Sequence, residues 1–166
     1  MADRDSRSTD WTPASGAAGV VAEFGEDRAL ELLACLLVGG VEPFEFGREP
    51  WAQVIAHIGN HAPTASSAAV DGDAVPLDLN RPVSAYWPRS WAARAFAYVG
   101  DERAAPWLVT GLADRHWRVR MTAAQTIGRL RIRGLEAELL PLLEDAHPRV
   151  RAAAELALER TVEAGR

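Results

Sequence analysis

Aspartate, histidine and arginine recur together at two places in the 166-residue chain, and such side chains could do acid–base or metal chemistry. The stretch DRHWRVR covers residues 114–120, and DAHPRVR covers residues 145–151. Five of the seven positions are identical, in the same order and spacing. Either the two copies form one paired chemical site, or the chain makes the same structural joint twice.

A metal site would need these histidines to be joined by carboxylates or thiols at matching offsets. His116 and His147 stand at equivalent positions, but no such set surrounds them, and no histidine in the chain is followed by Glu. His57 and His61 are four residues apart, yet a Gly-Asn pair interrupts the helix that would align them. The pattern therefore predicts no metal and no cofactor. It favours His116 and His147 as helix caps that accept a backbone N–H.

The remaining chemistry-bearing residues also point away from catalysis. Cys35 lies inside the apolar run LLACLLV, so it is expected to be a small buried hydrophobe and not a nucleophile. No convergent set of nucleophile, base and orienting group is visible, so the protein is predicted not to be an enzyme. A single cysteine, no secretory signal and no run of about 18 apolar residues predict a cytoplasmic protein without membrane contact.

Charge divides the chain into two halves. All basic residues are arginine; residues 1–80 hold four of them against thirteen acids, a net charge of −9. Residues 81–166 hold fourteen arginines against ten acids, a net charge of +4. Such asymmetry is expected either of an anion-binding half or of two halves that attract each other.

The elements that must position these residues begin with a divergent N-terminal part. Residues 1–22 are rich in Ala, Gly, Ser and Asp and are predicted to be a flexible tail. Residues 23–59 are predicted to form a helical cap or degenerate repeat, with helices over 26–38 and 50–58. Residues 60–82 contain many helix breakers and are predicted to be a long surface loop.

Residues 83–166 have a more regular pattern. They alternate between apolar-periodic segments and short turns, which predicts antiparallel helices near 89–99, 103–112, 116–131, 135–144 and 148–162. Pro141 should bend the fourth of these helices or lie near its start, because proline lacks the N–H for an intrahelical bond.

Two of these helices carry the same buried stripe. The first stripe consists of Val119, Ala123, Thr126, Ile127 and Leu130, and the second of Val150, Ala154, Ala157, Leu158 and Thr161. An earlier helix matches when Gly100 is set against Gly128, which places Trp91 and Ala92 opposite Val119 and Arg120. An internal repeat of about 28–31 residues with two helices per unit predicts a helical solenoid.

The repeat resembles a known family. A helix ending in Leu-x-Asp, a short turn, and then Val-Arg opening an Ala-rich helix with Ile-Gly near its end resembles a HEAT repeat. The period is similar to the short repeats of phycobilisome-lyase-type HEAT proteins, and the resemblance covers about residues 87–160. It implies an all-α, right-handed helical-repeat solenoid, an α-α superhelix. It also implies that Asp114, Arg120, Asp145 and Arg151 brace neighbouring repeats and are structural.

The same resemblance implies a binding surface, because the second helix of each HEAT repeat lines the concave face of the array. The expected surface is Arg118, Met121, Gln125, Arg129, Arg149, Ala152 and Leu156, flanked by Ser90, Ala93 and Ala97. Arginine and methionine are enriched in protein interfaces. The sequence therefore predicts a non-enzymatic adaptor or scaffold that binds another protein through an acidic or partly apolar segment.

Two alternatives remain open at this stage. Trp87, Trp91, Trp107 and Trp117 either pack a thin helical layer or, with the nearby arginines, line a nucleic-acid groove of the kind found in HEAT-like alkylpurine DNA glycosylases. The acidic pI of about 5.4 and the short array argue against nucleic acid. The chain could also be a lyase-type accessory subunit.

Overall fold

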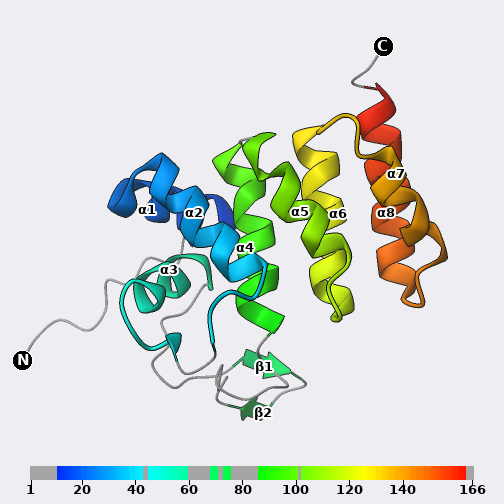
Figure 1. The fold of residues 1–166 in the computed structure, drawn as a ribbon. Coiled ribbons are helices and arrows are strands. Elements are labelled where there is room, and N and C mark those ends of the chain that lie inside the picture. The colour runs from blue at the N-terminus through cyan, green and yellow to red at the C-terminus, as the bar shows by residue number, and fades with distance from the viewer. Residues whose placement is uncertain are drawn as a thin grey trace, which may run out of the picture.

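The structure, a computed structural model, describes residues 11–42, 45–59, 68–70, 73–75, 86–100 and 102–163. The helices are α1 (Pro13–Phe24), α2 (Glu26–Leu37), α3 (Trp51–Ile58), α4 (Tyr86–Val99), η2 (Glu102–Ala104), α5 (Ala105–Leu112), α6 (Trp117–Leu130), α7 (Glu136–Leu139), η3 (Leu140–Glu144) and α8 (Pro148–Glu163). The fold is all-α and built from repeated helices, as predicted (Figure 1).

The prediction of a flexible tail over residues 1–22 is wrong for residues 13–22, because these residues belong to helix α1. Thr12 caps the helix, and its side chain and that of Ser15 form a reciprocal capping box. Pro13 occupies the first turn, where its missing N–H costs nothing. The Gly and Ala content that suggested a tail instead permits close packing: a Cβ at Gly16 would lie 2.4 Å from the carbonyl oxygen of His57 on α3.

The predicted helices over 26–38 and 50–58 are present as α2 and α3. Helix α2 begins with two acids, which suit the positive end of a helix dipole, and buries most of its leucines. Helices α1 and α2 both pack on α4, so this N-terminal part covers the first helix of the repeat region. The predicted long loop over 60–82 lies largely outside the described residues, but its described part forms an antiparallel pair, β1 (Ala68–Val70) and β2 (Asp73–Val75).

The repeat region forms two layers of helices (Figure 1). Helices α4, α6 and α8 lie side by side in one layer, and α5 and α7 with η3 cover them in the other. The five predicted helices are all found, with boundaries shifted by three residues or fewer at most ends. Pro141 lies at the start of η3, where the α-helix α7 gives way to a 3-10 helix, because the proline cannot continue the α-helical hydrogen bonding.

A single core joins the layers and includes Leu33, Leu37, Phe96, Leu108, Val119, Ile127, Leu139 and Val150. Of the stripe predicted on α6, Val119, Ala123, Thr126 and Ile127 are buried; on α8 the equivalent Val150, Ala154 and Ala157 are buried, and Leu158 is partly buried. The hydroxyl of Thr126 donates to the carbonyl oxygen of Ala93 on α4 at 2.9 Å. Burial of this polar group is therefore compensated.

The structure corrects the register of the first repeat. Helices α4 and α6 both have 14 residues and begin 31 positions apart, at Tyr86 and Trp117, and α8 begins a further 31 positions on, at Pro148. The predicted match of Gly100 to Gly128 was therefore wrong by three residues. In the 31-residue register Arg89 is the counterpart of Arg120, in place of Ala92, which the predicted alignment had set opposite it.

Candidate functional site

The repeated Asp-x-His-x-Arg-Val-Arg motif forms a joint between neighbouring units. Nε of Arg120 donates to Oδ2 of Asp145 at 2.7 Å, and Nη2 donates to Oδ1 at 2.9 Å. Nη1 of the same side chain donates to the carbonyl oxygen of Asp114 at 2.8 Å. The guanidinium group thus ties the start of its own helix to the start of α8.

The same joint occurs one unit earlier and is incomplete one unit later. Nε and Nη2 of Arg89 donate to the carboxylate of Asp114 at 2.7 and 3.2 Å. Nη1 of Arg151 donates to the carbonyl oxygen of Asp145 at 2.7 Å, but within the described residues no carboxylate meets its other nitrogens. Arg89, Arg120 and Arg151 therefore occupy equivalent positions, and two of the three are paired.

The ion pair at the second joint is largely shielded from water. The side chains of Arg120 and Asp145 are only 19% and 9% exposed. The hydrogen bonds from Arg120, together with the N–H of His147, hold the pKa of Asp145 below its ordinary value. The hydrogen bond to Asp145 likewise raises the pKa of Arg120. These shifts are those of a structural pair that stays ionised at neutral pH.

We expect Arg120→Ala to lower the free energy of unfolding by about 2–3 kcal/mol, because it strands a buried carboxylate. Arg151→Ala is the matched control: it removes hydrogen bonds to backbone oxygens but strands no acid, so it should cost about 1 kcal/mol or less. Chemical denaturation of both variants measures the difference. Equal losses would contradict a bracing role for the Arg120–Asp145 pair.

His116 and His147 cap their helices, as predicted. Nδ1 of His116 accepts the backbone N–H of Arg118 at 3.3 Å, and Nδ1 of His147 accepts that of Arg149 at 3.2 Å. Each imidazole also stacks on the aromatic residue that begins the preceding helix of the α4, α6 and α8 layer: His116 on Tyr86 at 3.5 Å, and His147 on Trp117 at 3.7 Å between ring centroids. The two histidines are thus occupied as caps and stacking partners.

We expect the free energy of unfolding to depend on pH through the protonation of His116, which caps α6. Burial, followed by the charge of Arg118, lowers the pKa of this imidazole in the folded protein. Below the ordinary value of about 6.5, the unfolded chain therefore takes up a proton that the folded protein resists, so stability is full at higher pH and falls on acidification. His116→Asn keeps a capping side chain and cannot titrate. Between about pH 7.5 and about pH 5, its unfolding free energy should fall less than that of the parent, and an unchanged slope would contradict this.

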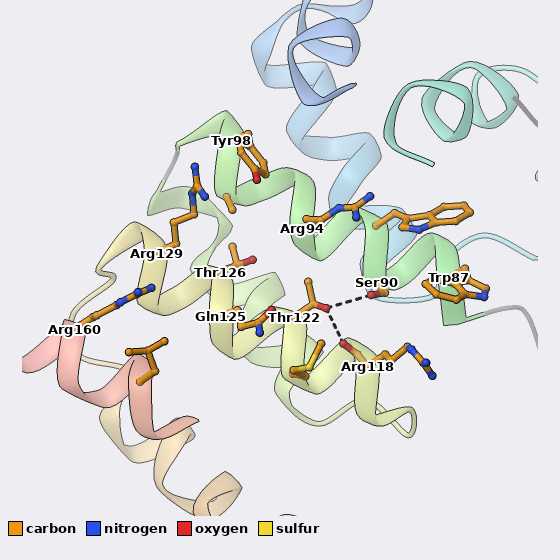
Figure 2. A pocket seen from close by; sticks show the side chains of 14 residues that line it. Trp87, Ser90, Arg94, Tyr98, Arg118, Thr122, Gln125, Thr126, Arg129 and Arg160 are labelled. Carbon is orange, nitrogen blue, oxygen red and sulfur yellow. Dashed lines mark hydrogen bonds between the residues drawn. The ribbon is translucent and has the colours of Figure 1, made fainter. Parts of the chain in front are cut away.

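A groove crosses the layer formed by α4, α6 and α8 (Figure 2). Its volume is about 530 Å³. It is lined by Trp87, Ser90, Trp91, Arg94, Ala97 and Tyr98 from α4, by Arg118, Met121, Thr122, Gln125, Thr126 and Arg129 from α6, and by Leu156 and Arg160 from α8. The second helix of each repeat thus supplies this surface.

The lining contains four arginines and no carboxylate among the residues that the structure describes. The guanidinium carbon of Arg118 lies 4.3 Å from the ring centroid of Trp117, and that of Arg129 lies 4.3 Å from the centroid of Tyr98. Nη2 of Arg94 donates to the carbonyl oxygen of Ile58 at 3.1 Å. Burial lowers the pKa of Arg94, yet a guanidinium group remains charged in proteins. The groove is therefore a positively charged surface in an acidic protein.

Five of the seven residues predicted for the binding surface line this groove: Arg118, Met121, Gln125, Arg129 and Leu156. Arg149 and Ala152 are exposed on α8 outside it, and Ala93 is buried beneath it. Arg94, Tyr98 and Arg160 also line the groove and were not predicted from the sequence. The 31-residue register would have found them, because it aligns Arg94 with Gln125 and aligns Tyr98, Arg129 and Arg160 with one another.

The tryptophan cluster divides between core and groove. Trp107 belongs to α5 in the other layer and packs on Phe96 of α4 at 5.8 Å between ring centroids. Trp91 is buried and Trp87 is partly exposed, and both also line the groove. Trp117 stacks between His147 and the guanidinium group of Arg118. The cluster is therefore divided between core packing and the lining of the groove.

Other candidate chemistry finds little support within the described residues. They contain no group of three or more His, Cys, Asp or Glu side chains placed to hold a metal ion. Burial raises the pKa of Cys35, which disfavours the thiolate. His57 lies 2.6 Å from Glu23 through Nε2, and His61 falls outside the described part of the chain. No helix in the described ranges is both long and apolar enough to cross a membrane.

Two layers of helices that repeat every 31 residues, with arginine joints between units, define an α-helical repeat protein. Residues 84–159 match the family model for HEAT repeats, so this segment of the chain is similar to the repeats of that family. The match confirms the resemblance predicted over about residues 87–160. No curated protein matches the chain. HEAT repeats commonly mediate protein interactions and scaffolding, and they are generally not catalytic.

Proposed function

We propose that this protein is a non-enzymatic adaptor that holds an acidic segment of another protein in the groove across α4, α6 and α8. The observation that carries the proposal is the charge of the lining: four arginines and, among the described residues, no acid. The chain has a net charge of −5, so the charge of this patch is opposite in sign to that of the chain as a whole. A positive concave surface attracts and orients acidic partners.

The arginines are prepared for binding by their neighbours. Stacking on Trp117 and Tyr98 limits the rotamers of Arg118 and Arg129 while leaving the edges of each guanidinium group open to a carboxylate. Less side-chain entropy is then lost when a partner binds. The groove is also partly apolar through Met121 and Leu156, the latter 42% exposed, which suits a segment that mixes acidic and apolar residues.

The lining offers poor catalytic groups. Among its described residues there is no His, Cys, Asp or Glu to act as a base or an activated nucleophile. The hydroxyls of Ser90 and Thr122 lie 3.2 Å apart, and Thr122 also donates to the carbonyl oxygen of Arg118 at 2.8 Å. These contacts support a binding role over a chemical one. A lyase-type accessory subunit is the same proposal with an enzyme as the partner.

We expect Arg118→Glu with Arg129→Glu to abolish capture of the protein partner while lowering the free energy of unfolding by no more than about 1–2 kcal/mol, the scale of the lost cation–π contacts. Arg115→Glu with Arg133→Glu is the matched control, since both side chains are exposed and lie outside the groove. It changes the net charge equally and should retain capture. Affinity purification with quantitative mass spectrometry measures both. Capture that survives in the groove variant, or is lost equally in both variants, would overturn the proposal.

Nucleic acid is the second candidate, because arginine beside aromatic rings suits stacking on bases. The rings of Trp117 and Tyr98 are already covered by arginine, which leaves less aromatic surface for a base. Binding to a single-stranded oligonucleotide should therefore be no tighter than about micromolar at physiological salt. Nanomolar binding that weakens steeply with salt would favour this candidate instead.

A further inference from the structure

We infer that the groove selects its partner by the spacing of acidic residues. Arg118 and Arg129 act as two separate carboxylate clamps, which accept an extended peptide segment with two acidic residues about six positions apart and an apolar residue between them. The inference rests on the proposed function and names the chemistry of the partner.

Arg118 forms the first clamp at the start of α6. Its guanidinium carbon lies 4.3 Å from the ring centroid of Trp117, 5.5 Å from that of Trp87 and 5.7 Å from that of Tyr86. Three rings thus surround one cation. No described carboxylate forms an ion pair with Arg118, so its N–H groups are available for a bidentate contact with a carboxylate from outside.

Arg129 forms the second clamp at the end of α6, stacked on Tyr98. Arg160, its counterpart on α8, lines the same end of the groove and adds a second positive charge there. Figure 2 shows Arg129 and Arg160 together at one end of the groove and Arg118 at the other. An acidic residue at either end therefore meets arginine and no described acid.

The distance between the clamps sets the spacing. Arg118 and Arg129 are eleven positions apart on one helix, a rise of about 16 Å between their Cα atoms. The side chain of Arg118 points away from Arg129, whose own side chain rises toward Tyr98 (Figure 2), so the bound carboxylates must lie at least this far apart. At about 3.3 Å per residue, an extended chain covers about 20 Å in six residues. Two acids that are adjacent or two residues apart cannot reach both clamps.

The volume favours an extended segment over a helix. The five extended residues between the acids occupy about 800 Å³ from strand dimensions, of the same order as the groove volume of about 530 Å³. A helix of about 16 Å with a diameter of about 10 Å occupies about 1,200 Å³, more than twice that volume. Between the clamps the groove presents Met121 and Leu156, which suit an apolar side chain, and the exposed amide of Gln125, which can bond to a peptide backbone.

The test uses the full chain and labelled peptides of equal length with a central Leu, of which two carry two Glu residues each and have equal charge. In one peptide the acids are six residues apart, in a second they are adjacent, and in a third one Glu of the spaced pair is Gln. Fluorescence anisotropy should show the spaced peptide binding at least about tenfold tighter than either of the others, because its second contact is intramolecular.

Variants assign each contact. Arg129→Gln should lower the affinity for the spaced peptide to that for the single-acid peptide. When the remaining Glu of the single-acid peptide lies at the Arg118 end, its affinity should change less than about twofold in this variant. Arg133→Gln, outside the groove, should change neither. Equal affinity for spaced and adjacent acids would overturn the two-clamp inference while leaving the proposed acidic-segment binding intact. No binding to any of these peptides, together with tight binding of an oligonucleotide of equal charge, would overturn both.

Discussion

Val119→Asp is expected to leave the repeat region unfolded or molten at room temperature. Val119 is 0% exposed and lies in the first turn of α6, the central helix of its layer, in the core shared by both layers. An unpaired carboxylate at this position costs at least about 4 kcal/mol, a large share of the stability of a domain of this size. Loss of the cooperative thermal transition by circular dichroism measures the effect.

Gln125→Asp is the control for Val119→Asp. It places the same charge on the same helix at an exposed position, so it should change the free energy of unfolding by about 1 kcal/mol or less. A Val119→Asp variant that melts cooperatively near the temperature of the Gln125→Asp variant would contradict the placement of Val119 in the core.

Gly128→Leu should have the second-largest effect, a loss of about 3 kcal/mol or more. A Cβ atom at Gly128 would lie 2.8 Å from the Cα atom of Ala157, and that neighbour is backbone that cannot rotate away. The added side chain therefore forces α6 and α8 apart, and overpacking of this kind destabilises a core. Denaturant unfolding of the variant measures the loss.

Arg129→Leu provides the comparison, since it introduces the same side chain at the next, exposed position of the helix. Its cost should stay within about 1 kcal/mol. Gly128→Ala should fall between the two variants, because the higher helix propensity of alanine offsets part of the crowding. If the Gly128→Leu and Arg129→Leu variants were equally stable, the close approach of α6 and α8 would be wrong.

The sequence predicted the elements whose signals are local. Helix α6 was expected over 116–131 and spans Trp117–Leu130, with His116 as its cap. This helix could be predicted because a cap and an apolar stripe are formed by residues close together in the sequence. Helix α1 was missed because its glycines and alanines read as a tail. Their function becomes visible only when His57 of α3, distant in sequence, lies against them.

The register error has a physical cause. Gly100 and Gly128 were aligned because both are glycines near a helix end, but they serve different purposes. Gly100 has φ 73° and ends α4 in the left-handed region, where its true counterpart is Arg131 with φ 53°. Gly128 is an interior helix residue that permits contact with Ala157. Matching them shifted α4 by three residues and hid Arg89, Arg94 and Tyr98.

The candidate groove could be predicted only in part. Its residues on α6 follow from helical periodicity, since the face opposite a buried stripe is exposed. The absence of acids from its described lining is a property of three helices together and depends on their relative register. A shift of three residues in one helix was enough to conceal it.

The ion pair between Arg120 and Asp145 makes the 31-residue unit a self-contained cassette that could be duplicated within the array. Residues 115–145 contain both an arginine that reaches forward and the aspartate that receives it, so a duplicate inserted in frame after Asp145 would carry its own complete connector. On α8 the cassette pattern stops: exposed Glu155 and Glu159 occupy the places of buried Ala124 and Gly128 in the 31-residue register. The array can therefore be lengthened from within, by about 10 Å of groove per added helix, more readily than by stacking onto its outer face.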